Sequence, residues 1–133
     1  MTYEEWEAGI DARIKRGPVW QMAGYRKALF LYDLVWADSD YWQKERKSWP
    51  IVDQIVRSAG SISANIEEGF GRGFGRDYAR FLRFALGSAR ETQGWYWRGR
   101  QMLPENVCHH RLALLDEIIA LLVTEVNRQI KFK

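Results

Sequence analysis

The sequence predicts an all-α protein, and three observations carry that prediction. Apolar residues recur at helical spacing in almost every segment, whereas no strand-like alternation of apolar and polar residues persists. Glycine or proline separates these segments, most clearly at Gly17-Pro18, between residues 69 and 75, and at Pro104. The 133 residues include one cysteine, so the chain can form no internal disulfide, and they suffice for one domain with a hydrophobic core.

The first predicted helix occupies roughly residues 2–16. Thr2 and Glu5 have the spacing of a capping box, in which the threonine side chain accepts a hydrogen bond from the backbone of the first turn. The apolar stripe of this helix consists of Tyr3, Trp6, Ile10 and Ile14. Gly17 and Pro18 are expected to end the helix, because neither residue favours its continuation.

Two longer helices are predicted next. The first runs from about residue 22 to residue 44. Its shared face carries Tyr25, Ala28, Leu29, Tyr32, Val35 and Trp36. Ser48 as N-cap and Pro50 in the first turn start the following helix, which ends near Gly69. Gly60 inside that helix costs up to about 1 kcal/mol relative to alanine, so we expect a neighbouring helix to approach closely there.

The remaining chain predicts a glycine-rich turn and two further helices. The turn, residues 69–75, is expected to need positive φ, and it lacks the Lys-Ser/Thr pair of a phosphate-binding loop. A helix over residues 76–102 follows, and Pro104 with Glu105 opens the last one. One side of the last helix carries Leu112, Leu115, Ile119, Leu122, Val126 and Ile130, and a second side carries Leu114, Ile118 and Leu121. A helix that is apolar on two sides is buried on two sides, and we expect one of them to face another subunit.

Two segments together resemble a known family. They are the run 61–69, Ser-Ile-Ser-Ala-Asn-Ile-Glu-Glu-Gly, with Arg72 after it, and Phe81-Leu82, Ala85-Leu-Gly87-Ser88 and Glu91-Thr92. They resemble the small helical proteins encoded in intervening sequences of bacterial 23S ribosomal RNA genes, over roughly residues 22–130. The resemblance implies an antiparallel up-and-down four-helix bundle that assembles as a homopentamer and is not an enzyme. The first helix is an addition to that bundle, so residues 1–17 form an N-terminal extension and residues 18–133 the bundle domain.

A related group offers an alternative function. Its members are basic pentameric bundles that serve as accessory subunits of reverse transcriptases in diversity-generating retroelements, where they bind the polymerase and RNA. If this chain is such a scaffold, Trp6, Trp97 and the N-terminal helix are the expected contacts for the protein partner.

The basic residues are unevenly distributed along the chain. Residues 69–100 contain seven arginines and two acidic residues, a net charge of +5, while the rest of the chain carries −2. These arginines are Arg72, Arg76, Arg80, Arg83, Arg90, Arg98 and Arg100. At 100° per residue, all except Arg100 fall within about 40° of one line along a helix. The tyrosine- and alanine-rich face of the same helix lies opposite, so we expect the arginines to face outward.

This arginine stripe predicts a nucleic-acid-binding surface. Arginine can hold a phosphate through two parallel hydrogen bonds, and Trp97, near the same side, could stack on a base. RNA is expected in preference to DNA. Two alternatives stay open, namely an acidic protein partner and a solvated helix face, although a solvated face usually mixes both signs of charge.

A second set of polar residues is predicted to have a structural role. Asn65 and Glu68 are three residues apart, as are Ser88 and Glu91, so each pair shares a helix face. We expect these residues to form a polar network between two helices, with Glu68 or Glu91 paired to Arg57 or Arg72. A metal or catalytic carboxylate site is disfavoured because no Glu-x-x-His motif accompanies them.

The other reactive residue types give no recognisable site. His109 and His110 are adjacent and so point in different directions from a helix, and Cys108 has no patterned partner. We therefore expect no cofactor, no bound metal and no catalytic residue. The first residues lack the order of a signal peptide, and no apolar run reaches the length of a membrane span, which predicts a cytoplasmic protein without a membrane partner.

Overall fold

The computed structural model describes residues 1–131, and in this part of the chain every regular element is a helix. The α-helices are α1 (Tyr3–Ala8), α2 (Ala12–Arg16), α3 (Ala23–Gln43), α4 (Trp49–Phe70), α5 (Arg76–Arg98) and α6 (Glu105–Gln129). Short 3₁₀ segments precede or connect them: η1 (Pro18–Gln21), η2 (Arg46–Ser48) and η3 (Arg100–Met102). The prediction of an all-α protein is confirmed.

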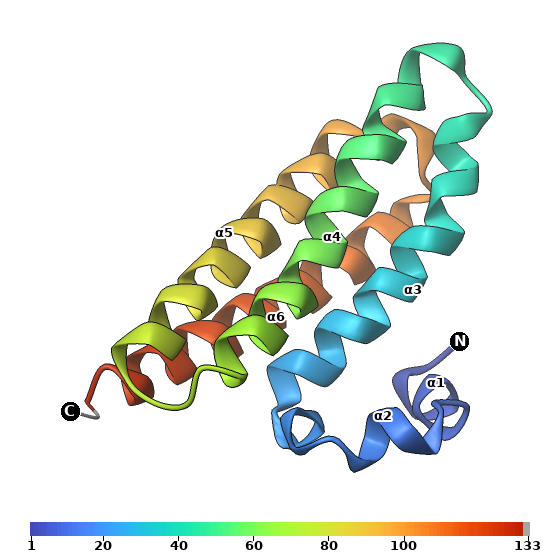
Figure 1. Ribbon diagram of the computed structural model, residues 1–133. Coiled ribbons are helices and arrows are strands. Elements are labelled where there is room, and N and C mark those ends of the chain that lie inside the picture. Colours follow the sequence, from blue (N-terminus) through green and yellow to red (C-terminus); the bar gives the residue numbers. More distant parts are fainter. Residues whose placement is uncertain (132–133) are drawn as a thin grey trace.

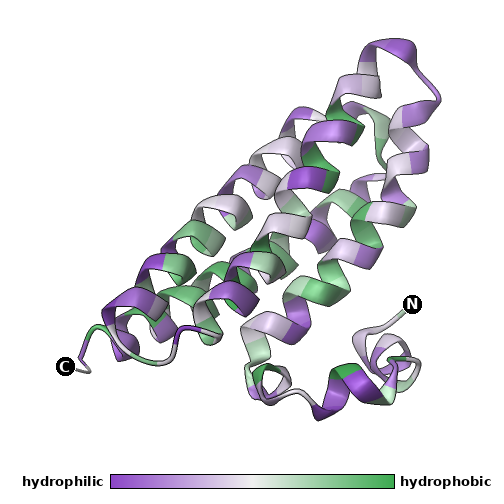
Figure 2. Ribbon diagram, in the orientation of Figure 1, coloured by the Kyte–Doolittle hydropathy of each residue, from purple (hydrophilic) through white to green (hydrophobic). Residues whose placement is uncertain are grey.

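Four long helices form an up-and-down bundle, with α1 and α2 beside the N-terminal end of α3 (Figure 1). Helix α4 packs against α3 and α5, and α6 packs against the same two helices, so α3 and α5 occupy opposite corners. Each long helix carries hydrophilic and hydrophobic residues on different sides, as amphipathic helices do (Figure 2). The fully buried large side chains include Leu31, Trp42, Ile55, Ile62, Ile66, Leu82, Tyr96, Leu115, Ile118 and Leu122.

Both apolar sides of α6 are largely covered within one chain, although Ile130, at the end of the first side, is 43% exposed. Leu115 and Leu122 are fully buried, and on the second side Ile118 is fully buried and Leu114 is 9% exposed. The reason is the place of α6 between α3 and α5. The two-sided pattern therefore follows from the bundle itself, and it does not require the second subunit that we inferred from it.

The N-terminal segment differs from the single helix expected there. Gly9 ends α1, and the side chain of Asp11 accepts a hydrogen bond from the backbone N–H of Arg13 to start α2. These two caps are stronger local signals than the apolar stripe that spans them. As a result Ile14 leaves the stripe and is 45% exposed.

Trp6 anchors this segment on the bundle. Its ring stacks 6.1 Å from that of Trp20 and lies 5.4 Å from that of Phe30, both distances measured between centroids. The indole Nε1 donates a hydrogen bond of 2.7 Å to Asp33 Oδ2 on α3. With 6% of its surface exposed, Trp6 cannot be the contact for a protein partner that we expected, because it is already buried inside this chain.

Glycines mark the closest approaches between elements. A Cβ on Gly60 would lie 3.2 Å from the Tyr32 ring, which explains the glycine inside α4. In the turn after α4, Gly73 and Gly75 have φ of 95° and 85°, as expected for the glycine-rich segment. Helix α5 ends at Arg98, earlier than predicted, because Gly99 caps it against the ring of Trp42.

Candidate nucleic-acid interface

All seven arginines of residues 69–100 are exposed, but they do not all lie on one helix. Arg76, Arg80, Arg83, Arg90 and Arg98 belong to α5, on the side opposite its buried residues. Arg72 lies in the turn before α5 and Arg100 in η3 after it. The expectation that Arg72 continues the helical stripe is therefore wrong, because the chain is not helical between residues 72 and 75.

The N-terminal end of the stripe is partly neutralised by acidic side chains. Arg72 lies 3.2 Å from Glu68 and 3.6 Å from Asp77, and Arg80 lies 3.1 Å from Asp77. This end of the surface therefore mixes both signs of charge, in contrast to the nearly acid-free stripe that we predicted. Exposed pairs of this kind contribute little to stability, on the order of 0–1 kcal/mol each.

Four of the seven arginines are placed against aromatic rings. The guanidinium of Arg72 lies 4.9 Å from the ring centroid of Phe81. The guanidinium of Arg80 lies 4.8 Å from the ring centroid of Phe81, and that of Arg98 lies 4.7 Å from the ring of Trp95. Arg100 is the closest, at 4.0 Å from the ring of Trp97. These cation–π contacts hold the side chains in defined positions on the surface.

The other three arginines of this segment make no hydrogen bond, ion pair or ring contact within residues 1–131. They are Arg76, Arg83 and Arg90. They are spaced seven residues apart, and Trp97 is the next position in the series. Seven residues are nearly two helical turns and about 10 Å of rise, so these four side chains follow one side of α5 for about 32 Å and drift by only about 20° around the helix at each step. We call Arg76, Arg83, Arg90 and Trp97 the open row.

Glycines flank the open row on α5. Gly87 is exposed, and a Cβ added there would have no neighbour within 4 Å. A Cβ on Gly94 would meet only the flexible end of Arg98, at 2.9 Å. The helix backbone beside the row is therefore uncovered at Gly87, where an extended polymer can approach it closely, whereas the Arg98 side chain lies over Gly94.

A chain of hydroxyl groups joins α4 to α5. Ser88 Oγ donates to Ser61 Oγ at 3.0 Å, and Asn65 Nδ2 donates to the same oxygen at 2.9 Å. Thr92 and Ser58, both buried, form a second contact of 2.9 Å. Small hydroxyl residues satisfy one another here while the two helices stay close, which is a structural role.

The charged members expected in this network lie elsewhere. Arg57 pairs with Asp53 at 3.3 Å on the surface of α4, and Glu91 accepts a hydrogen bond of 3.1 Å from Trp95 Nε1. Glu68 does pair with Arg72, as expected, but on the exposed surface and not within the network. Arg57 and Glu91 stay outside the network because both lie on exposed sides of their helices.

Sequence reasoning missed a buried charged cluster between α3, α5 and α6. Arg111 Nε and Nη2 lie 2.7 Å and 3.0 Å from the two oxygens of Asp38, whose side chain is 4% exposed. The hydroxyl of Tyr96 donates to Asp38 at 2.7 Å, and burial together with this carboxylate raises the pKa of Tyr96 well above its ordinary value. The available signal was an aspartate at helical spacing between the buried residues Val35 and Trp42.

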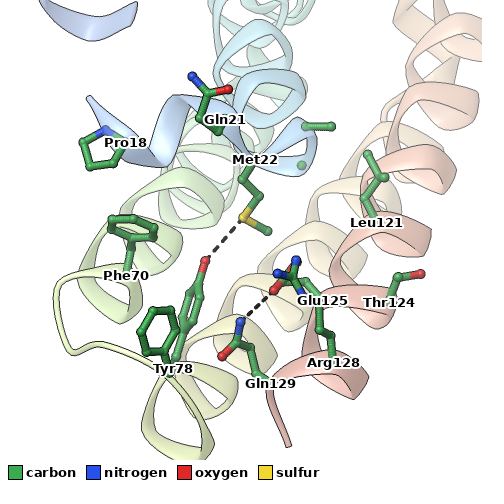
Figure 3. A pocket seen from close by; sticks show the side chains of 13 residues that line it. Pro18, Gln21, Met22, Phe70, Tyr78, Leu121, Thr124, Glu125, Arg128 and Gln129 are labelled. Carbon is green, nitrogen blue, oxygen red and sulfur yellow. Dashed lines mark hydrogen bonds and ion pairs between the residues drawn. The ribbon is translucent and has the colours of Figure 1, made fainter. Parts of the chain in front are cut away.

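A cavity of about 440 Å³ lies at the end of the bundle near the glycine-rich turn (Figure 3). Its polar side chains bind one another: Gln129 Nε2 donates to Glu125 at 2.8 Å, and Gln129 Oε1 accepts from the backbone N–H of Gly75 at 3.0 Å. The Tyr78 hydroxyl points at the sulfur of Met22, 3.5 Å away. These contacts fix the turn to α6, so we assign this cavity a packing role.

Residues 1–131 contain neither a metal-ligand cluster nor a membrane-spanning helix. No group of three or more His, Cys, Asp or Glu residues in this range is arranged to hold a metal ion. None of its helices combines the length and the apolar character needed to cross a membrane.

Comparison with known proteins agrees with this geometry. A sequence model of the family described as 23S rRNA-intervening sequence protein matches residues 21–124, which form most of the bundle. The chain belongs to this family. The resemblance carried by residues 61–92 is thereby confirmed, whereas no match was found among curated proteins.

A solved structure related to this 23S rRNA-intervening sequence protein shares its fold. It is a protein of unknown function from the S23 ribosomal protein family of Bacteroides thetaiotaomicron, 24% identical, with a TM-score of 0.71. The alignment covers 78% of this chain and 98% of the other. Neither description mentions a reverse transcriptase, and the burial of Trp6 removes one contact on which the accessory-subunit alternative depended.

Proposed function

We propose that this protein binds nucleic acid, RNA in preference to DNA, through the open row on α5. The observation that carries the proposal is the state of Arg76, Arg83 and Arg90. Each is exposed, and none is engaged with another of residues 1–131. A ligand phosphate can therefore use all their N–H donors without first breaking an internal ion pair.

The shape of the surface supports an extended ligand. The three arginines follow one side of α5, and Gly87 leaves the helix backbone beside them uncovered. A nucleic-acid backbone presents negative charges at regular intervals, so several of them can be neutralised along one helix. Phosphate contacts fix position without reading sequence, and selectivity then comes from the shape of the ligand.

The family description favours RNA as the ligand. It associates the family with 23S rRNA, and ribosomal RNA functions in the cytoplasm. We therefore propose an RNA ligand and a cytoplasmic location together.

We propose a binding role and not a catalytic one. The carboxylates on the adjoining helices that could serve as acid or base are committed to other contacts: Glu68 to Arg72, and Glu91 to Trp95. A general acid or base must instead be free to reach the proton that it transfers.

The family fold is also proposed to act as a homopentamer. Trp36 and Trp49, 64% and 53% exposed on α3 and α4, are large apolar side chains available to a neighbouring copy. Such an assembly would present five open rows, and weak contacts on each copy would add through multivalency.

The decisive variant is Arg76→Glu/Arg83→Glu/Arg90→Glu, tested against single-stranded RNA by fluorescence anisotropy over a range of salt concentrations. Three lost phosphate contacts are expected to reduce the slope of log affinity against log salt by about 2, since each contact on a single strand contributes about 0.7. The fold should stay intact, because all three side chains are exposed and without contacts among residues 1–131.

A matched control separates position from net charge. Arg16→Glu/Arg46→Glu/Arg57→Glu makes the same change of charge at exposed positions outside α5. This control should keep most of the affinity. Equal losses in the two triple variants, or an unchanged affinity in the first, would show that the open row is not the binding surface.

A further inference from the structure

The open row ends at a small cavity between η3 and the start of α6. The cavity measures about 380 Å³. Its lining includes Trp97, Arg100, Leu103, Cys108, His109 and Leu112. The phosphate-binding role proposed above makes no use of it.

One wall of this cavity is planar and polar. Trp97 is 55% exposed, and the guanidinium of Arg100 lies 4.0 Å from its ring centroid. Arg100 Nη1 also donates a hydrogen bond of 2.8 Å to the backbone oxygen of Trp97, which fixes the guanidinium beside the indole. Two planar groups are thus held in place before any ligand arrives, so little side-chain entropy is lost on binding.

The floor of the cavity is apolar and the rim carries both signs of charge. Leu103 and Cys108 are 8% and 7% exposed. At the rim, Glu105 lies 3.5 Å from His109 Nε2 and faces the same cavity as Arg100. The cavity therefore has no excess of positive charge, unlike the open row, and it suits a neutral group with hydrogen-bonding edges better than a phosphate.

We propose that this cavity holds one unpaired base of an RNA strand whose phosphates follow the open row. The inference rests on the proposed function and adds the class of ligand. A base is a neutral planar ring: it can stack on the Trp97–Arg100 wall while its edge meets Glu105 and His109. Trp97 stands two turns beyond Arg90 on the same line of α5, so one strand can reach both.

This arrangement distinguishes single strands from duplexes. A base inside a duplex is stacked and paired, and it must leave the helix before it can enter a cavity. Single-stranded segments, loops and strand ends meet that requirement without cost. The protein is therefore expected to bind an unpaired RNA more tightly than the same sequence in a duplex.

The test uses two strands of about 16 nucleotides, near the upper site size of single-strand-binding folds. One is an ordinary RNA of mixed sequence, and the other is its abasic counterpart with the same phosphates. Trp97→Ala should weaken binding of the ordinary strand roughly 5- to 150-fold, the loss typical of one stacked base, and leave binding of the abasic strand unaffected. Arg83→Glu should weaken binding of both strands.

Ile14→Ala is the control, because Ile14 is an apolar side chain, 45% exposed, on α2, outside both the open row and the tryptophans proposed to meet a neighbouring copy. It should change neither affinity. The base site is refuted if Trp97→Ala lowers the affinity for both strands equally. It is also refuted if Trp97→Ala lowers neither affinity while Arg83→Glu lowers both. In either case the proposed arginine surface stands. If wild-type protein binds neither strand, the proposed function fails and this inference fails with it.

A second measurement reports on the cavity itself. Cys108 is the only cysteine and lines the floor, so its alkylation by iodoacetamide follows access to the cavity. Burial raises the pKa of this thiol, so the reaction will be slow and easily followed by mass spectrometry. The ordinary strand should slow the alkylation and the abasic strand should not. Equal rates with both strands would refute the base site.

Discussion

Asp38 shows how much one buried carboxylate determines. It lies inside α3, where an apolar residue would continue the stripe, and it accepts hydrogen bonds from Arg111 on α6 and Tyr96 on α5. One residue thereby links three of the four long helices. Buried ion pairs add little net stability compared with apolar residues of the same size, and their clearest contribution is to fix register.

Removing one partner of the Asp38–Arg111 pair should cost more stability than replacing both. Asp38→Ala leaves the Arg111 guanidinium, 13% exposed, without its carboxylate and should lower the free energy of unfolding by about 3–5 kcal/mol. Replacing both charges, as in Asp38→Leu/Arg111→Met, should cost clearly less. Urea denaturation followed by circular dichroism measures both. A double variant as unstable as the single one would contradict this account of the pair.

Individual arginines also differ in what they can offer to a ligand. Arg80 is held by Asp77 and lies over the Phe81 ring, whereas Arg83, three residues later, has no such contact within residues 1–131. In the sequence alone, the seven arginines of residues 69–100 cannot be told apart in this respect. Which of them are free depends on rotamers and on neighbours across a turn, and these are properties of the folded chain.

At the scale of elements, the glycines of α4 and α5 are not equivalent. A Cβ on Gly69, near the end of α4, would come within 2.7 Å of the Phe81 Cβ on α5, whereas a Cβ on Gly87 meets nothing within 4 Å. The first glycine permits two helices to touch. The second serves no packing purpose within residues 1–131, and it keeps a strip of α5 uncovered beside the open row.

Alanine substitutions test this difference. Gly87→Ala should raise the free energy of unfolding by about 0.5–1 kcal/mol, because it removes backbone freedom from the unfolded chain and meets no obstacle in the helix. Gly69→Ala should lower it, since Phe81 and Tyr78 must move. Thermal unfolding of the two variants beside the wild type gives the comparison. Destabilisation by Gly87→Ala would mean that another molecule covers Gly87 in the folded protein.

The helices themselves could be predicted where a long apolar period was available, and α3, α4 and α6 begin and end close to their expected positions. The break between α1 and α2 was missed because Gly9 and Asp11, two short-range caps, interrupt a stripe that otherwise persists. The role of Asp38 could not be predicted, since its partner Arg111 lies 73 residues away. The apolar period of a sequence indicates which residues of a helix are buried. It does not indicate which other helix packs against those residues.

For the whole molecule, the bundle separates two kinds of surface. The open row occupies the outer side of α5, while Trp36 and Trp49 are exposed on α3 and α4. Because α3 and α5 lie at opposite corners, contacts between copies through Trp36 need not obstruct the open row. Self-association and RNA binding are therefore compatible in this fold.

The corresponding prediction concerns mass. If the proposed homopentamer is correct, light scattering coupled to size exclusion should give about five times the mass of the 15.7 kDa chain. Trp36→Glu/Trp49→Glu should lower that mass, because each buried charge without a partner opposes the interface. A wild-type monomer would contradict the homopentamer. It would leave each chain with a single row and without the gain from multivalency.

The spacing of the open row makes α5 intolerant of changes in length. Each residue of an α-helix turns the chain by about 100°, so one residue inserted between Arg83 and Arg90 would rotate Arg90 and Trp97 out of line with Arg76 and Arg83. The same insertion would move Tyr96 away from Asp38 in the core. An insertion of seven residues would nearly restore the phase. Variation in the length of this protein is therefore expected in its turns and N-terminal segment, and in α5 only by whole pairs of helical turns.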